Sequence, residues 1–223
     1  MLKQSSMGGI LPHYPACTST PDEDKLMKHP TFFEKIETIK LQDDLSNFLG
    51  TFEDGYVEFT YLDIVKSAGH SCPTVLGAYL MASEGLKALY KNEIAKRGEI
   101  MVEFAQNENE GVAGVIANVI TNITGATVNL GFKGIAGDYD RRNLMQFEAP
   151  IKSNVKFTRK DCNDSVDVFY DPSSIPGDPK ISMLMQLILQ ENATSAQQKE
   201  FGILWQQRVE AISNRIGEVI KVD

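Results

Sequence analysis

Cysteine, long apolar runs and positive charge are all scarce in this chain of 223 residues. Its three cysteines cannot form a framework of disulfides, and an odd number is typical of a reducing compartment, so we expect a cytoplasmic protein. No run approaches the roughly 18 apolar residues of a membrane-spanning helix, and Met1–Ala16 lacks the apolar stretch of a signal peptide, so we expect no membrane partner. The net charge of −8 argues against a nucleic-acid partner, because such proteins need a basic face.

The sequence does contain a mixed series of strand and helix patterns. Alternating apolar residues predict strands, and apolar residues at helical spacing predict helices. The expected strands are 56–61, 99–105, 144–147 and the hairpin 154–159 with 166–170; the expected helices are a short one within 29–50 and then 73–90, 111–124, 181–190 and 195–220. This order predicts an α+β fold with a mixed or antiparallel sheet packed with helices.

Changes in composition divide the chain into three parts. Residues 1–28 are rich in serine, glycine and proline and predict a partly disordered N-terminal arm. Residues 29–172 contain most of the strand and helix patterns and form the predicted core. Prolines then interrupt the pattern, and residues 173–223 form a predicted helical extension whose apolar stripe around Trp205 indicates core or dimer packing.

The segment Gly69-His70-Ser71-Cys72-Pro73 carries the strongest indication of chemistry. Proline is favoured in the first turn of a helix, so Pro73 predicts a helix start with Cys72 at its cap. A sulfur at that place faces backbone N–H groups and the positive end of the helix dipole, which favour a thiolate. We therefore predict Cys72 as a nucleophile or metal ligand and His70 as a second ligand or acid–base group.

The same two residues also allow a plain interpretation. Cys72 can be a small buried hydrophobic residue and His70 an ordinary loop histidine, and the sequence weights this alternative about equally. Zinc suits one thiolate and one imidazole, but a tetrahedral site needs three or four ligands. Two residues alone do not complete such a site.

This segment, followed by Gly77 and a long helix, resembles the Gly-His-x-Cys-Pro-Gly segment of the FmdE-like family, which takes its name from formylmethanofuran dehydrogenase. The resemblance continues through the pattern at 111–125, the Gly131–Gly134 loop and the strand at 144–147, and it covers roughly residues 55–150. It implies an α+β core, a homodimer and a metal or active site at His70 and Cys72.

The chain also departs from the pattern of that family. Ala126 stands where the family has a second cysteine, Ala68 replaces a histidine, and Thr74 follows the proline instead of glycine. The C-terminal region has no Cys-x-x-Cys pair, so the zinc-finger appendage of some members is absent. The resemblance is therefore to a divergent branch.

Other histidines and cysteines are weaker candidates. His13 and Cys17 lie four residues apart in the predicted arm, where coincidence is favoured, although the arm of a second copy of the chain could complete the His70/Cys72 site. His29 is a further possible donor of the same kind. Cys162 lies in an acidic turn, which disfavours a thiolate.

Lys133, Arg141 and Arg142 form a basic exception beside the glycine-rich segment 131–137. They predict a cofactor- or ligand-binding pocket for a small anionic molecule, and ordinary ion pairing with Asp138 and Asp140 is an equally weighted alternative.

These observations leave three functions open. The first is a zinc- or thiolate-dependent enzyme at His70 and Cys72 acting on a small, anionic molecule. The second is a carrier that holds a metal or a metallated cofactor such as haem without turnover. The third is an accessory subunit whose C-terminal helices make its contacts.

Overall fold

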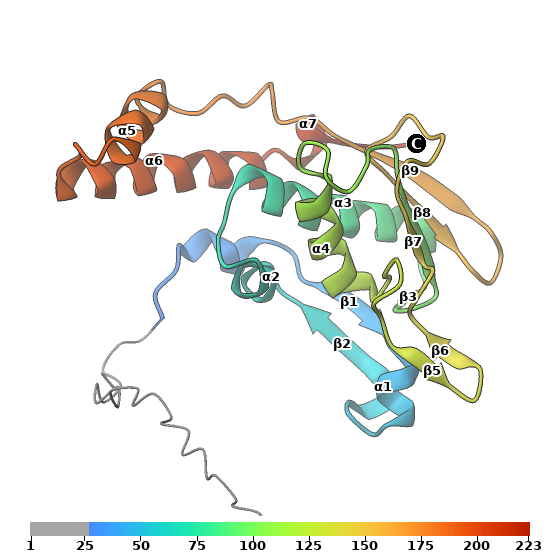
Figure 1. Cartoon of the computed structure of the whole chain (residues 1–223). Helices are drawn as coiled ribbons and strands as arrows, with labels where there is room; N and C mark the ends of the chain where they lie inside the picture. The colour runs from blue at the N-terminus through green and yellow to red at the C-terminus, as the bar shows by residue number, and fades with distance from the viewer. Residues whose placement is uncertain (1–26) are drawn as a thin grey trace, which may run out of the picture.

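The computed structural model describes residues 27–223, and Figure 1 shows their arrangement. It is an α+β fold, as the sequence predicts. No helix within these residues has both the length and the apolar character needed to span a membrane. The predicted arm, with His13 and Cys17, falls almost entirely outside the described residues.

The main sheet has five strands in the order β10-β9-β8-β4-β7. These strands are β4 (Ile100–Phe104), β7 (Met145–Gln146), β8 (Val155–Arg159), β9 (Ser165–Tyr170) and β10 (Ile220–Val222). All neighbouring pairs are antiparallel except β4 and β7. The predicted hairpin is confirmed, since Val155 of β8 pairs with Val168 of β9.

Helix α3 (Pro73–Tyr90) packs on this sheet and forms the centre of the core. Most of its side chains are buried, including Val75, Leu76 and Leu80, because it is covered by strands on one side and by other helices on the other. The covering helices are α4 (Ala113–Thr124) and α2 (Tyr61–Ala68), which also contact each other. The predicted helix start at Pro73 is confirmed.

Helix α2 ends the predicted strand 56–61 early. Thr60 and Asp63 form a capping box, in which each side chain accepts a hydrogen bond from the backbone N–H of the other residue. The chain therefore turns into a helix after Phe59, and β2 is limited to Tyr56–Phe59.

A three-stranded sheet, β2-β1-β3, lies at the end of the molecule opposite the C-terminal helices in Figure 1. It contains β1 (Ile39–Gln42) and β3 (Ala95–Lys96), and short helices flank its strands: η1 (Thr31–Lys35), α1 (Asp44–Phe48) and η2 (Glu53–Gly55). The predicted glycine-rich loop contains a small antiparallel hairpin of β5 (Lys133–Ile135) and β6 (Asp138–Asp140).

The C-terminal part combines a projecting helical hairpin with a return to the sheet. Helices α5 (Lys180–Leu189) and α6 (Ser195–Ser213) pack against each other and project from the body. The predicted helix 195–220 is too long, because α6 ends at Ser213 and α7 (Ile216–Val219) leads into β10. Val209 and Ile220 are buried in the core. Residues 173–223 are therefore only in part the separate helical extension that the sequence predicts.

Candidate functional site

Cys72 is the N-terminal cap of α3, as the sequence predicts. Its backbone is extended, with φ −150° and ψ 168°, and Pro73 occupies the first helical position. The N–H of Val75 donates a hydrogen bond to Cys72 Sγ, at 3.4 Å. This N–H and the positive end of the helix dipole both favour negative charge on the sulfur.

His70 directs one ring nitrogen at this sulfur. Its Nε2 lies 3.4 Å from Cys72 Sγ, and its Nδ1 lies 3.0 Å from the carbonyl oxygen of Ala68. A carbonyl can only accept a hydrogen bond, so Nδ1 carries a proton and Nε2 of a neutral ring has a free lone pair facing the thiol. Gly69 ends α2 with φ +76°, and this left-handed turn brings the two side chains together.

Ser71, between these residues, fixes the segment to the body. Its carbonyl oxygen accepts hydrogen bonds from Trp205 Nε1 and Gln206 Nε2 of α6, each at 3.1 Å. Its hydroxyl lies 2.9 Å from the hydroxyl of Tyr61, and both residues are buried. His70 is exposed and Cys72 is half-buried, and the segment that carries them has a rigid support.

Two tyrosines, the buried Tyr61 and the half-buried Tyr170, flank the pair. Burial raises the pKa of Tyr61 and of Tyr170 above the ordinary tyrosine value, and the nearby Cys72 adds to both shifts. Both hydroxyls therefore stay protonated, and Tyr170 donates a 2.6 Å hydrogen bond to the carbonyl of Pro73. Neither tyrosine is identified by the sequence patterns, because each comes from a distant segment.

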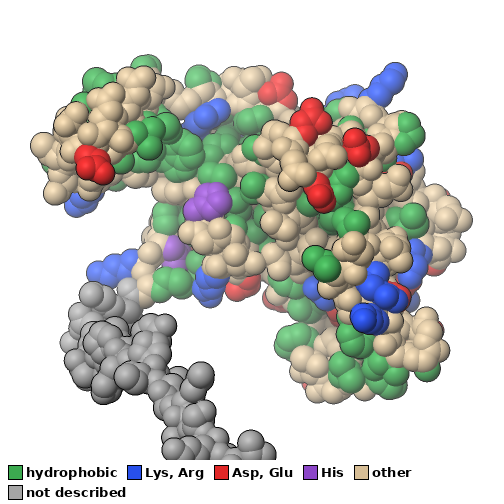
Figure 2. Space-filling model, viewed as in Figure 1, with side chains coloured by type: hydrophobic (Ala, Val, Ile, Leu, Met, Phe, Trp, Pro, Cys, Tyr) green, Lys and Arg blue, Asp and Glu red, His purple; other side chains and the backbone are tan. Residues whose placement is uncertain are grey.

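A pocket of about 410 Å³ lies on the α2–α4 side of His70. Its walls are formed by the end of α2, by His70 and by one face of α4: Ser67, Ala68, His70, Val115, Asn118, Val119, Thr121 and Asn122. This volume is in the range of small-molecule sites. In Figure 2, histidine atoms reach the surface beneath the projecting C-terminal hairpin.

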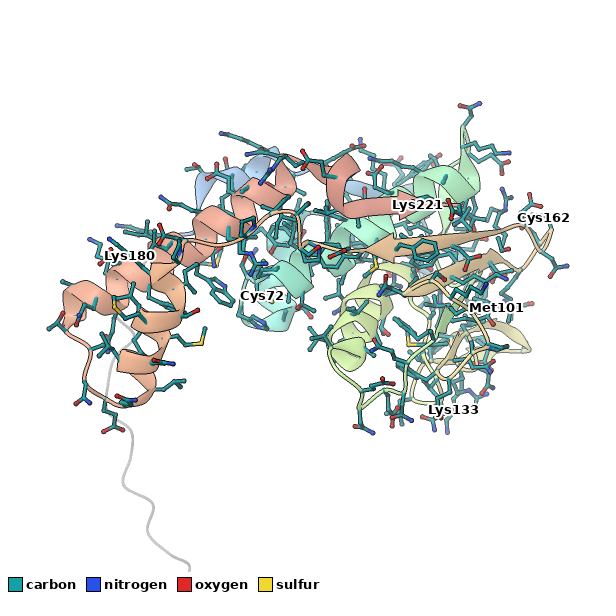
Figure 3. The ribbon with its side chains drawn as sticks, turned by 90° about the horizontal axis from the view of Figure 1, so that it is seen from above. Cys72, Met101, Lys133, Cys162, Lys180 and Lys221 are labelled. Carbon is teal, nitrogen blue, oxygen red and sulfur yellow. The ribbon has the colours of Figure 1, made fainter. Side chains whose placement is uncertain are left out.

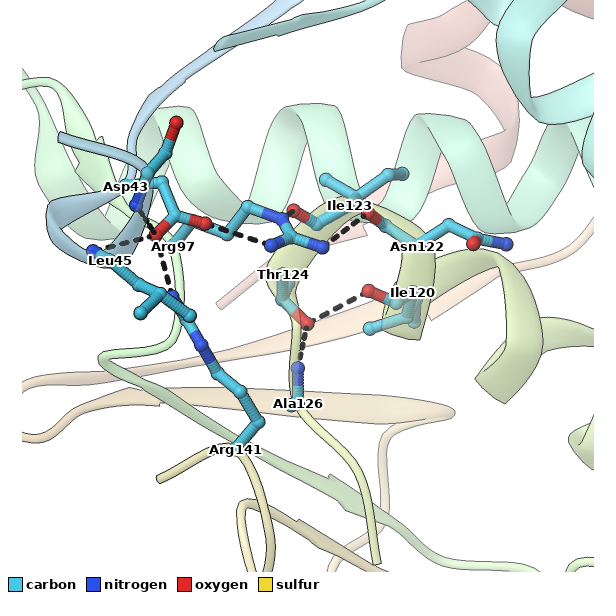
Figure 4. Close-up of polar contacts among 10 residues, drawn as sticks. Asp43, Leu45, Arg97, Ile120, Asn122, Ile123, Thr124, Ala126 and Arg141 are labelled. Atoms are coloured by element: carbon cyan, nitrogen blue, oxygen red, sulfur yellow. Dashed lines mark hydrogen bonds and ion pairs between the residues drawn. The ribbon is translucent and has the colours of Figure 1, made fainter. Parts of the chain in front are cut away.

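Arg141 is not available for an anionic ligand, contrary to the sequence prediction. Its side chain is only 7% exposed, and Nη2 forms a 2.6 Å ion pair with Asp43 Oδ1. Arg97 pairs with the other carboxylate oxygen at 2.8 Å, as Figure 4 shows. Burial alone would raise the pKa of Asp43, but the hydrogen bond from Arg97 and the charge of Arg141 hold it below its ordinary value.

Arg142 and Lys133 lie apart from Cys72 as well. Arg142 donates two hydrogen bonds to the Asp140 carboxylate, at 3.0 and 2.7 Å, and these lower the pKa of Asp140 to about 2. Lys133 is exposed on β5, and Figure 3 places it far from Cys72. The predicted basic pocket thus separates into a buried ion-pair cluster, a surface ion pair and an exposed lysine.

Among the described residues, the other candidate donor, His29, does not join His70 and Cys72. Within residues 27–223, no group of three histidine, cysteine or acidic side chains is arranged to hold a metal ion. His29 stacks on Phe33 and lies 4.0 Å from Glu34. Zinc would therefore find two ligands among the described residues, one fewer than a catalytic site needs.

Cys162 lies at one end of the molecule, well away from Cys72, as Figure 3 shows. A backbone hydrogen bond from Asp164 favours its thiolate, but burial and the acidic side chains of Asp161 and Asp164 outweigh this and raise the pKa of Cys162. The acidic turn disfavours a thiolate there, as the sequence predicts.

No protein-family model matches the chain, and no curated protein matches it. The family resemblance stays a prediction.

Proposed function

We propose that Cys72 and His70 form a thiol–imidazole centre that acts on a small molecule. The observation that carries this proposal is the 3.4 Å separation of Cys72 Sγ and His70 Nε2, with Nδ1 held by the carbonyl of Ala68. In the proposed reaction the thiol proton moves to Nε2 and the sulfur forms a bond to an electrophilic carbon of the substrate. The displaced group leaves with the bonding electron pair, and the imidazolium can protonate it.

The surroundings of the pair support this chemistry. The N–H of Val75 and the α3 dipole favour the thiolate, and the bonds from Trp205 and Gln206 to Ser71 fix the segment. Cys162 has neither an imidazole nor a helix start beside it, and its acidic neighbours disfavour the thiolate. It serves as an internal reference for a thiol with no base beside it.

The test is the rate at which iodoacetamide alkylates each cysteine, measured by peptide mass spectrometry. We expect Cys72 to react at least about tenfold faster than Cys162 at pH 7, in line with the usual contribution of a positioned base. His70→Ala should remove most of this difference, and His29→Ala is the matched control that should not. Equal rates at Cys72 in the wild type and His70→Ala would refute the proposal.

Zinc binding by the same pair is the second candidate. Two ligands of one tetrahedral zinc ion, a sulfur at about 2.3 Å and a nitrogen at about 2.0 Å, lie about 3.5 Å apart. The separation of Cys72 Sγ and His70 Nε2, 3.4 Å, is close to this value. Cys72 and His70 would hold such an ion, whose Lewis acidity would polarise a substrate. The family resemblance favours the same site, and a third ligand from His13 or Cys17 is the alternative to their coincidental spacing.

Metal analysis and an absorption spectrum separate the remaining functions. Stoichiometric zinc that is lost in both Cys72→Ser and His70→Ala, and kept in Cys162→Ser, would support the zinc site. A haem absorption band lost in the same variants would support the carrier instead. A protein that binds neither group and whose Cys72 is unreactive would be an accessory subunit.

We further propose that the protein works in the cytoplasm as a homodimer. Free thiols at Cys72 and Cys162 agree with a reducing compartment. Helix α5 is almost entirely apolar but buries only Leu184, while Met183 and Leu189 are 53% and 76% exposed. Sedimentation velocity tests the dimer: the double variant Met183→Glu, Leu189→Glu should be monomeric, and unchanged sedimentation would contradict this contact.

A further inference from the structure

The pocket between α2 and α4 shares His70 with the proposed centre. His70 forms part of its wall and also contacts Cys72 Sγ through Nε2. A molecule in the pocket therefore lies against the imidazole that would exchange a proton with the thiol. The nature of its walls then determines which molecules the centre accepts.

The walls of this pocket carry no fixed charge. None of its lining residues is a lysine, arginine, aspartate or glutamate, and His70 is the only titratable group among them. By contrast, the wall of a second pocket, beside α1, includes four charged side chains: Asp43, Glu58, Asp63 and Arg97. Taking a carboxylate or an ammonium group out of water costs several kcal/mol unless an opposite charge pairs with it, so the α2–α4 pocket disfavours ions.

The polar groups of the pocket are amides and hydroxyls. Asn122 Nδ2 donates to Ser67 Oγ at 2.9 Å and to the carbonyl of Asn118 at 3.0 Å, which leaves Asn122 Oδ1 as an acceptor. The side chain of Asn118 adds a donor and an acceptor, and Val115 and Val119 add apolar surface. Both amides and both valines come from α4, so their relative positions are fixed by one helix.

The geometry points to a small uncharged carboxamide as the ligand of this pocket, with its carbonyl accepting from Asn118, its amide N–H donating to Asn122 Oδ1 and its apolar part on Val115 and Val119. This inference rests on the proposed thiol–imidazole centre and names its substrate class. It replaces the anionic ligand that the sequence predicts, since Arg141 and Arg142 are paired elsewhere.

Two probes of the same shape test the charge preference: isobutyramide, which is neutral, and isobutyrate, which is an anion. Each is added while iodoacetamide alkylates Cys72 in the full-length protein. We expect isobutyramide to slow the reaction with saturation, by about twofold at millimolar concentration, as a ligand of six heavy atoms can. Isobutyrate should have no effect at the same concentration.

Asn118→Leu should abolish the protection by isobutyramide, because it keeps the size of the side chain and removes its hydrogen bonds. Asn192→Leu, in the connection between α5 and α6, is the matched control and should keep the protection. Equal protection by isobutyrate, or no protection by either probe, would overturn the inference. The proposed function itself fails if, without any probe, Cys72 is alkylated equally fast in the wild type and in His70→Ala. The failure of the inference and the failure of the proposed function are therefore distinguishable.

Discussion

At the scale of single residues, Gly77 allows α3 to pack closely against Tyr170. A Cβ atom at this position would overlap the Tyr170 ring, which is held by its hydrogen bond to Pro73. Gly77→Ala should therefore destabilise the protein by about 1–3 kcal/mol, because the ring or the helix must move. Urea unfolding followed by circular dichroism measures this change.

Gly202→Ala is the matched control for that variant. Gly202 lies within α6 and has no atom within 4 Å of the added Cβ. Alanine has the higher helix propensity, so this variant should gain up to about 1 kcal/mol. A similar loss of stability in both variants would contradict the proposed packing role of Gly77.

Asp43 pairs with both the buried Arg141 and the half-buried Arg97. Asp43→Asn keeps a side chain that can cap α1 but leaves Arg141 buried without a charged partner. We expect a loss of about 3–5 kcal/mol in urea unfolding, as for other broken buried ion pairs. Glu200→Gln breaks the exposed pair with Lys180 and should cost no more than about 1 kcal/mol.

The pH dependence of stability follows from the same carboxylate. The pKa of Asp43 is lower in the folded protein than its ordinary value of 3.8. The Asp43 carboxylate therefore contributes its full stabilisation above pH 3.8, and this stabilisation is lost as the pH falls through the pKa of the folded state. The stability difference between wild type and Asp43→Asn should therefore shrink below about pH 4. A difference that stays constant from pH 7 to pH 3 would show that Asp43 does not titrate in this way.

At the scale of elements, α6 positions the segment that carries Cys72. Gln206→Leu removes one of the two donors to the Ser71 carbonyl and should cost about 1 kcal/mol. Trp205, the only tryptophan, donates the other bond, so its fluorescence should shift in this variant. Gln207→Leu, one residue further along α6 and exposed, should change neither stability nor fluorescence.

Several elements could be predicted from their own residues. The long helices α3 and α4 and the β8–β9 hairpin follow from local apolar periodicity. Helix α2 and strand β1 are too short for that signal, although the Thr60/Asp63 capping box marks the start of α2. The apolar stripe places the end of α6 too late, because it continues into α7 and β10 although the backbone leaves the helical conformation at Arg215, with φ −132° and ψ 45°.

At the scale of the whole molecule, the C-terminus completes the main sheet. β10 pairs with β9, and Val219 and Ile220 are buried in the core. A chain that ends at Ser213 loses this strand and should be less stable by about 3–6 kcal/mol from the two buried side chains alone. Unchanged urea unfolding of the truncated chain would show that residues 214–223 add nothing to the fold.

The sequence by itself determined the α+β class, the acidic net charge and the pairing of His70 with Cys72. This pair lies within a single turn, which Gly69 and Pro73 set up locally. Only the tertiary structure decided what surrounds it. Arg141 meets Asp43 across 98 residues of sequence and Trp205 meets Ser71 across 134, and no local pattern encodes contacts that form only when the core packs.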